Sequence, residues 1–441
     1  MRINREQIDR WIEAQYHYFE SQQPEKAADM VDLLLEPLFR IGRYSELIAI
    51  LEQTLKSGEL STAYFIFHAR SLSALGRHEQ ALVELNIVEA EVKDEPEWRA
   101  AILIDKGSIL RRSGDTSRAD EILEAFREAY EIYDYAIIPN ATTETDKSRG
   151  LRNKAKALFN EGAILQYFLS RPEEAMQRYD GALKIFENQQ TKDEDGIAVT
   201  YKQMGEIYAA KDSGKLYDPD RALEYLENGL KMFREQESPT RILETIYQLG
   251  RISEAEKALQ FFKEYLEIAK GLGLAREEAI AKRHIAELNV RLFERGTLPD
   301  EADLERKRAN VYDSSIALLN DAERTLQLYE SDIWSRRTLA NCYYTLGQLW
   351  LKLHSTEKAM DYFQKSLKVS NEEIFKGSSP GDVRRRLKAV LRIVQLFYLS
   401  GAVHDARHLI ANYESDFYLL KLDYPDEKRV DQLISQLEAK E

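Results

Sequence analysis

A six-residue frame that returns after 34 residues constrains this chain more than any other feature. Gly42-Arg43-Tyr44-Ser45-Glu46-Leu47 recurs as Gly76-Arg77-His78-Glu79-Gln80-Ala81 and again as Gly250-Arg251-Ile252-Ser253-Glu254-Ala255. In each copy a glycine turn is followed five residues later by a small or apolar residue, so one helix can end, reverse and pack closely on the next. The frame therefore predicts stacked helical hairpins, in which each repeat contacts mainly its neighbours.

The small or apolar residue that opens the second helix of each hairpin marks further copies of the repeat. These markers are Leu47, Ala81, Ala119, Ala175, Ala222, Ala255, Ala359 and Ala406. Successive gaps range from 33 to 104 residues, which indicates a repeat loosened by insertions. In the best-preserved copy, apolar residues recur at helical spacing from Tyr343 to Trp350 and again from Ala359 to Leu367.

This unit, with Tyr343, Leu346 and Gly347 on its first helix and Ala359 and Phe363 on its second, resembles the tetratricopeptide repeat. The resemblance implies an all-α fold, a right-handed superhelical solenoid of antiparallel helical hairpins. About nine hairpins are expected, with a capping helix at each end.

Departures from the period divide the chain into segments. We expect a capping helix within 1–24, repeats over 25–271, an irregular helical hairpin over 272–330, repeats over 331–424 and a second capping helix over 425–441. The irregular hairpin should have helices near 275–295 and 301–329, joined by a turn at Gly296-Thr297-Leu298-Pro299. Between 136 and 152 polar residues replace the apolar period, which predicts a mobile surface loop.

Composition argues against nucleic-acid binding, disulfide bonds, cysteine-rich zinc sites and a membrane segment. The net charge of -14 disfavours direct binding of nucleic acid, because such binding needs a basic face. Cys342 is the only cysteine, so intramolecular disulfides and cysteine-rich zinc sites are excluded. The charged start and the lack of a long apolar run predict a cytoplasmic protein without a membrane segment.

The sequence predicts no enzyme and no cofactor. It contains no phosphate-binding Gly-Lys-Ser or Gly-Lys-Thr loop, no dinucleotide-binding glycine motif and no Gly-x-Ser-x-Gly elbow. His404 and His408 have metallopeptidase spacing, but Asp405 stands where the catalytic Glu would be, and we expect no metal site. Cys342 precedes the packing residue Tyr343, which predicts a half-buried, unreactive thiol.

A ligand is expected on the inner face of the stack, which the first helices of the hairpins line in tetratricopeptide proteins. Tyrosine and arginine are frequent binding anchors, and asparagine and glutamine can satisfy the main chain of an extended peptide. The register predicts a partner-binding groove formed by Arg70, Ser108, Arg111, Arg112, Asn160, Lys202, Tyr247, Asn341, Tyr344, Gln348, Gln395 and Tyr398.

Basic residues on this face suggest two further hypotheses. The carboxylate clamp of some tetratricopeptide proteins uses lysines, asparagines and an arginine, which Arg70, Arg111, Asn160 and Lys202 echo in part. A denser basic cluster is formed by Arg384, Arg385, Arg386, Lys388 and Arg392. It either binds an acidic partner or is only the charged start of a helix, and we favour the second interpretation.

The N-terminal fifth of the chain has a more specific resemblance. Ala14-Gln15-Tyr16-His17-Tyr18-Phe19, Glu25-Lys26-Ala27-Ala28 and the segment from Glu36 to Leu47 resemble the repeats that follow the winged helix of bacterial STAND signal-transduction ATPases. In those proteins the repeats act as a sensor, and ligand or protein binding permits oligomerisation. The chain has no nucleotide-binding domain of its own, so the resemblance implies a sensor arm or a partner of a separate ATPase or effector.

Three functional hypotheses follow. The first is a non-catalytic interaction scaffold that binds a protein segment or peptide in its concave groove. The second is the ligand-sensing arm, or a partner, of a bacterial signal-transduction or immune ATPase, in which small rotations between repeats add along the stack. The third is a peptide-responsive regulator that resembles the quorum-sensing repeat proteins.

Overall fold

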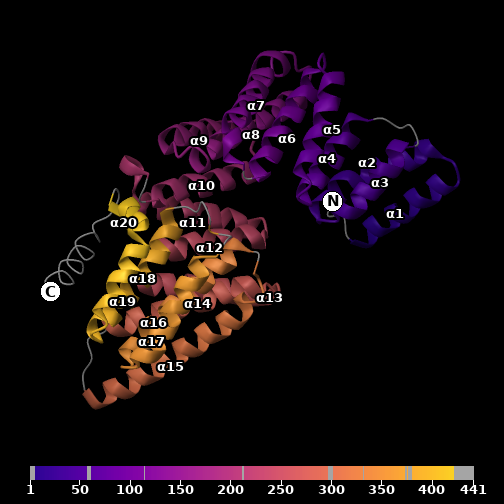
Figure 1. Ribbon diagram of the computed structural model, residues 1–441. Coiled ribbons are helices and arrows are strands. Elements are labelled where there is room, and N and C mark those ends of the chain that lie inside the picture. The colour runs from indigo at the N-terminus through magenta and orange to yellow at the C-terminus, as the bar shows by residue number, and fades with distance from the viewer. Residues whose placement is uncertain are drawn as a thin grey trace. The chain divides into compact units, whose positions relative to one another are not determined.

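The computed structural model describes residues 5–56, 61–113, 115–210, 213–295, 301–330, 332–372, 375 and 380–421. The chain divides into two compact units, Met1–Gln236 and Glu237–Glu441, and each is described by itself. Every regular element among the described residues is helical, and they contain no strand (Figure 1). The predicted all-α class is confirmed.

Unit 1 begins with α1 (Arg5–Glu20), which packs on the helix that follows it. Five hairpins of consecutive, contacting helices then complete its described part. They are α2 (Pro24–Arg40) with α3 (Tyr44–Lys56), α4 (Thr62–Ala74) with α5 (His78–Glu91), α6 (Pro96–Ser113) with α7 (Ala119–Ile132), α8 (Glu144–Tyr167) with α9 (Pro172–Glu187), and α10 (Glu194–Ala209) with α11 (Pro219–Glu235).

Unit 2 contains four hairpins and a short final helix in its described part. The hairpins are α12 (Pro239–Ile252) with α13 (Ala255–Gly271), α14 (Ala275–Arg295) with α15 (Glu301–Leu326), α16 (Ile333–Lys352) with α17 (Thr356–Ser370), and α18 (Pro380–Leu399) with α19 (Val403–Asn412); α20 (Glu414–Lys421) follows. Helices α14 and α15 correspond to the irregular hairpin that the sequence predicts. Its turn at 296–299 lies outside the described residues.

Small residues hold the two helices of a hairpin close together. All eight marker residues lie in the first turn of a second helix, and none is more than 3% exposed. On the first helix, a glycine lies against a large side chain of the second. A Cβ added at Gly347 would be 2.7 Å from the ring of Phe363, and one added at Gly250 would be 2.6 Å from that of Phe262. These contacts are those of tetratricopeptide-like hairpins.

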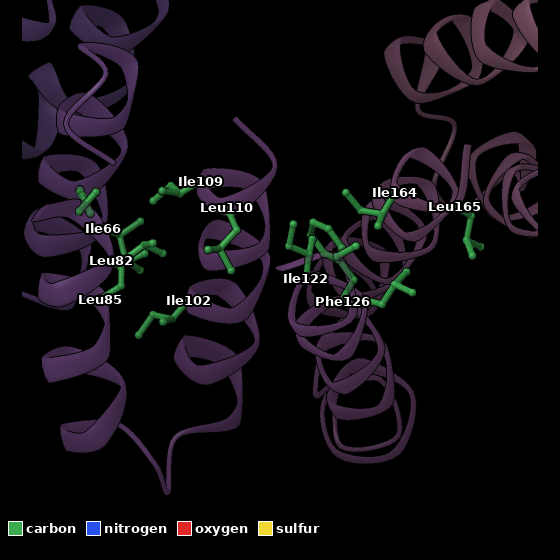
Figure 2. Packing of buried hydrophobic residues seen from close by; sticks show 14 of the residues in the cluster. Ile66, Leu82, Leu85, Ile102, Ile109, Leu110, Ile122, Phe126, Ile164 and Leu165 are labelled. Carbon is green, nitrogen blue, oxygen red and sulfur yellow. The ribbon is translucent and has the colours of Figure 1, made fainter. Parts of the chain in front are cut away.

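Apolar side chains also join each hairpin to the next. Figure 2 shows Ile66, Leu82 and Leu85 of the α4–α5 hairpin facing the side chains of α6. Phe126 of α7 continues the same cluster towards Ile164 of α8. One cluster of buried residues is therefore shared by successive hairpins from α3 to α10, while α1 and α2 pack in a second cluster with residues of α3 and α4, as nearest-neighbour packing predicts.

The predicted loop between 136 and 152 is wrong for most of its length. A π-helix (η2, Tyr133–Ile137) extends α7, and α8 already begins at Glu144. Thr143 caps α8, because its side chain accepts a hydrogen bond from the backbone N–H of Asp146 at 3.0 Å. Only residues 138–143 lie outside helices.

Two other predicted segments are compared with the structure as follows. The division between the compact units, at Gln236, falls inside the predicted repeat segment 25–271. The predicted C-terminal capping helix at 425–441 lies outside the described residues. Among the residues that are described, none of the helices is both long and apolar enough to cross a bilayer.

Candidate functional site

The predicted groove residues all lie on first helices of hairpins. In unit 1 they are Arg70 on α4, Ser108, Arg111 and Arg112 on α6, Asn160 on α8 and Lys202 on α10. In unit 2 they are Tyr247 on α12, Asn341, Tyr344 and Gln348 on α16, and Gln395 and Tyr398 on α18. Their surroundings differ greatly from one helix to the next.

Arg70 is engaged within the fold. Its Nε donates to Oδ1 of Asp105 on α6 at 2.8 Å, and its guanidinium lies 5.1 Å from the ring centre of Phe67. Burial raises the pKa of Asp105 above its usual value, although the Arg70 charge opposes this. Arg70 therefore links α4 to α6 and offers less free charge than the sequence suggested.

Lys202 also has a partner in the described structure. Its Nζ lies 3.7 Å from Glu206 one turn along α10. The hydroxyl of Tyr167 on α8 donates to Gln203 at 2.6 Å and also bonds to Glu206. These contacts join α8 to α10 through polar side chains on their inner faces.

The remaining predicted residues of unit 1 are less constrained. Arg111 is half-buried, and its Nε has no hydrogen-bond partner within the described part of the chain. Burial lowers the pKa of Arg111, and the adjacent Arg112 lowers it further. Arg112 is exposed, whereas Ser108 and Asn160 are half-buried. None of these four side chains lines either of the two cavities described below.

Unit 2 contains a cavity of about 560 Å³ lined by the first helices of three successive hairpins. Helices α14, α16 and α18 each contribute to its wall. The lining residues are Arg283, Glu287, Val290, Arg291, Glu294, Asn341, Tyr344, Thr345, Gln348, Leu349, Lys352, Arg385 and Lys388. Three predicted groove residues, Asn341, Tyr344 and Gln348, are thus brought to one site.

The two acidic residues of the cavity are both neutralised by neighbours. Glu287 lies 3.3 Å from Nη2 of Arg283 and accepts a hydrogen bond from Thr345 at 2.8 Å. Glu294 pairs with Lys352. The wall carries five basic and two acidic side chains, so its formal charge is 5 − 2 = +3.

The other three basic side chains of the wall differ in their partners, and only two of them are left without an acidic neighbour among the described residues. Arg385 donates to Asp382 at 2.5 Å and to Oδ1 of Asn341 at 3.3 Å. Arg291 and Lys388 are exposed, and neither forms an ion pair with any described residue. Anionic groups that enter the cavity would therefore meet cations that are not already paired.

The sequence did not predict that α14 contributes side chains to the wall of the cavity. Arg283, Glu287, Arg291 and Glu294 recur every three or four residues and so occupy one face of that helix. This spacing is visible in the sequence. It does not identify α14 as a first helix, because α14 lacks the glycine that marks first helices such as α12 and α16.

Three predicted groove residues do not line this cavity. Tyr247 packs against Phe262 and against His284, with ring centres 6.1 and 5.6 Å apart. Gln395 accepts a hydrogen bond from Arg392 at 3.0 Å. Tyr398 is half-buried against the core of the last hairpin. The first and last of these side chains contribute to packing.

The basic cluster at the start of α18 is largely paired inside unit 2. Arg385 bonds to Asp382, and Arg386 donates to Asp416 at 2.7 Å. Lys388 alone among these three basic residues is both exposed and directed to the cavity wall. Arg386 is thus engaged within the fold, whereas Arg385 and Lys388 line the cavity, so the choice between the two interpretations stays a prediction.

The two histidines and the cysteine considered above lie in different surroundings. His404 and His408 are exposed on α19, and in the part of the chain that is described no three His, Cys, Asp or Glu side chains are grouped to hold a metal. Cys342 is fully buried, not half-buried, and burial raises the pKa of its thiol to about 12. A thiol with so high a pKa is a poor nucleophile at neutral pH.

No family model matches the chain, and no curated protein matches it in sequence. Among solved structures it is similar to a STAND signal-transduction ATPase with a tetratricopeptide repeat sensor from Pyrococcus horikoshii, at 14% identity and a TM-score of 0.48, over 89% of this chain and 55% of that one. It is also similar to the apo quorum sensor NprR from B. thuringiensis, at 13% identity and a TM-score of 0.46, over 85% of this chain and 97% of that one. Apo RapI gives 14% identity and a TM-score of 0.45, over 70% and 97% of the two chains. At such identities no residue role is transferred between the proteins.

Proposed function

We propose that this protein is a non-catalytic interaction scaffold, and that the inner cavity of unit 2 binds an acidic, extended peptide segment of a partner protein. The observation that carries the proposal is the charge of the cavity. Its wall is formally +3, and both of its carboxylates are paired with wall residues.

The negative charge of the rest of the chain strengthens the preference of the cavity for an acidic segment. The net charge is -14, so most of the surface repels an acidic segment while the cavity attracts it. A local field of this kind concentrates the ligand at one site and raises its association rate. The same field makes binding weaken as salt is added.

Polar side chains on α16 suit the main chain of a peptide. Asn341, Tyr344 and Gln348 follow one face of the helix at spacings of three and four residues. Gln348 donates to the hydroxyl of Tyr344 at 3.3 Å, a long bond that a ligand can replace. Amide groups offer both a donor and an acceptor, as the peptide backbone requires.

The test uses the full chain and a fluorescein-labelled peptide of alternating glutamate and alanine, with fluorescence anisotropy as the readout. The double variant Arg291→Glu, Lys388→Glu reverses the two wall cations that form no ion pair with a described residue. Lys368→Glu, an exposed lysine on α17 outside the cavity, is the matched control. Losing two exposed charge contacts and adding repulsion should cost about 2 kcal/mol, or roughly 30-fold in affinity.

Three results support the proposal together: the glutamate peptide binds, its lysine counterpart does not, and only the cavity variant weakens binding. Equal binding of both peptides, or equal loss in the control variant, would show that the cavity does not select acidic segments. Circular dichroism of each variant checks that the helices remain folded.

A further inference from the structure

A second cavity, of about 320 Å³, lies in unit 1 where the repeat is interrupted. It is formed by the first turns of α6, by the π-helix η2 that extends α7, and by the early turns of α8. The 56-residue gap between the markers Ala119 and Ala175 contains this interruption. Short π-helical insertions occur frequently at functional sites.

The interior of the cavity is mainly apolar. Trp98 and Ala101 of α6 form one side, and Tyr133 and Ile137 of the π-helix form another. Gly150 of α8 also lines the cavity, and a Cβ added there would lie 3.0 Å from the side chain of Ile138. The volume is at the lower end of the range of about 300–1,000 Å³ found for small-molecule sites, so it suits one small ligand with an apolar body.

Two opposite charges stand at the edge of this apolar space. Nη2 of Arg149 lies 3.9 Å from Oε2 of Glu97, too far for a hydrogen bond. Both side chains are more than half exposed. Arg149 donates to Asp146 at 2.8 Å through Nη2, and no other hydrogen bond engages its guanidinium within the described residues. The remaining guanidinium donors, and the Glu97 carboxylate, are accessible to a ligand.

We propose that this cavity binds a free apolar α-amino acid. Its carboxylate would bind Arg149 and its ammonium group Glu97, since both charges lie on one carbon and match two adjacent, opposite partners. Its side chain would pack between Trp98 and Ile137. Asn153, which also lines the cavity and whose side chain bonds to the hydroxyl of Tyr133, offers a further polar contact at the inner end.

The proposed ligand needs both a carboxylate and an ammonium group, because a ligand with only one of them would contact only one of the two charged side chains. An apolar carboxylate without an ammonium group would place no positive charge beside Glu97, and an apolar amine would bring no carboxylate to the guanidinium donors that Arg149 does not use for Asp146. The proposal concerns unit 1 alone and does not depend on the peptide groove proposed for unit 2.

Isothermal titration calorimetry of the full chain tests it with L-phenylalanine and L-leucine as probes. N-acetyl-L-phenylalanine lacks the ammonium charge, and L-phenylalaninamide lacks the carboxylate. Arg149→Gln and Glu97→Gln each remove one charge at the exposed edge. Arg171→Gln is the matched control, because Arg171 is likewise exposed and pairs with an acid three residues away.

We expect at least one of the two amino acids to bind. Both blocked derivatives, and both charge variants, should bind it about tenfold more weakly or worse, while Arg171→Gln binds as the wild type does. Ala101→Leu, which fills the cavity without altering its charges, should also abolish binding. Thermal melting of each variant verifies that it is folded.

The proposal is overturned if neither amino acid binds at about 10 mM, a concentration that would reveal even millimolar affinity. It is also overturned if a blocked derivative binds as tightly as the free amino acid. That outcome would mean that the cavity takes a chain end or a side chain of a partner protein instead.

Discussion

Replacing Gly347 tests the packing that defines the hairpins. In Gly347→Ala the new Cβ would lie 2.7 Å from Cδ1 and Cε1 of Phe363, whereas carbon atoms pack best at about 3.5–4.0 Å. The ring cannot retreat easily, because Phe363 is fully buried in a cluster with Ile393 and Leu396. Helices α16 and α17 must therefore move apart by up to about 1 Å.

The expected cost follows from two opposing effects. Overpacking of a core costs about 1–3 kcal/mol, and replacing glycine by alanine inside a helix returns up to about 1 kcal/mol. Because the buried ring of Phe363 cannot retreat, the overpacking cost should lie in the upper part of this range, at about 2–3 kcal/mol, and Gly347→Ala should then lower the free energy of unfolding by about 1–2 kcal/mol. Gly347→Leu, which adds a whole branched side chain, should cost about 3 kcal/mol.

Urea unfolding followed by far-UV circular dichroism measures the effect. Gly271→Ala is the matched control, because its added Cβ meets no atom within 4 Å and should be neutral or slightly stabilising. Phe363→Leu in the Gly347→Ala background shortens the opposing side chain and should recover part of the loss, giving a favourable coupling between the two sites. If Gly347→Ala is as stable as the wild type, the packing argument for this hairpin is wrong.

Two further predictions concern titratable groups. Burial raises the pKa of Asp332, but hydrogen bonds from Ser335 and the charge of Arg276 outweigh it and leave the pKa below its usual value. Its charged form thus stabilises the folded state above the unfolded pKa of about 3.9, and this contribution is lost as pH falls through the lower folded pKa. Asp332→Ala, which also removes the cap of α16, should lower the free energy of unfolding by about 1 kcal/mol at pH 7. The difference in urea midpoint between this variant and the wild type should shrink below about pH 4. A difference that stays constant with pH would contradict this prediction. Cys342, buried and with its pKa raised to about 12, should not react with iodoacetamide at pH 7.5 or so until the protein is unfolded, as mass spectrometry can show; rapid labelling of the native chain would contradict its burial.

The hairpins could be predicted from the sequence because their contacts are local. Two helices can approach closely only where small residues, such as Ala359 and Gly347, lie between them. Both residues can be read directly from the sequence. The irregular pair α14 and α15 was also predicted, although it lacks the repeat residues. Its helices run from Ala275 to Arg295 and from Glu301 to Leu326.

The polar segment after α7 was misread because polarity was taken as evidence for a loop. Thr143 and Asp146 form a helix-start signal three residues apart, and this local signal outweighs the loss of apolar period. The π-helix before it has no comparable signature. It appears only when the packing of Tyr133 and Ile137 against α6 and α8 is known.

The candidate site could be predicted only in part, for a geometric reason. Helical periodicity identifies which face of α16 is directed inward, and so it found Asn341, Tyr344 and Gln348. A cavity, however, depends on how three first helices are placed side by side. Arg283 and Arg291 of α14 complete the wall, and their role follows from that placement, which the sequence of one repeat does not contain.

Basic side chains such as Arg70, which the sequence suggested for ligand binding, form ion pairs within the fold. The distance in sequence between the paired residues explains why. Several ion pairs join residues 34 to 36 positions apart, which is one repeat length: Arg43 with Asp9, Arg70 with Asp105, Arg127 with Glu161, and Arg336 with Glu372. Arg70 with Asp105 connects the first helices α4 and α6 of neighbouring hairpins, and Arg127 with Glu161 connects α7 to α8, so these two pairs contribute to stacking. Reversing the charge of Arg70 would therefore perturb the contact between α4 and α6 as well as any ligand. Arg291 and Lys388, which form no ion pair with described residues, separate binding from folding, and a loss of peptide affinity in that variant at unchanged unfolding free energy would assign the effect to the cavity.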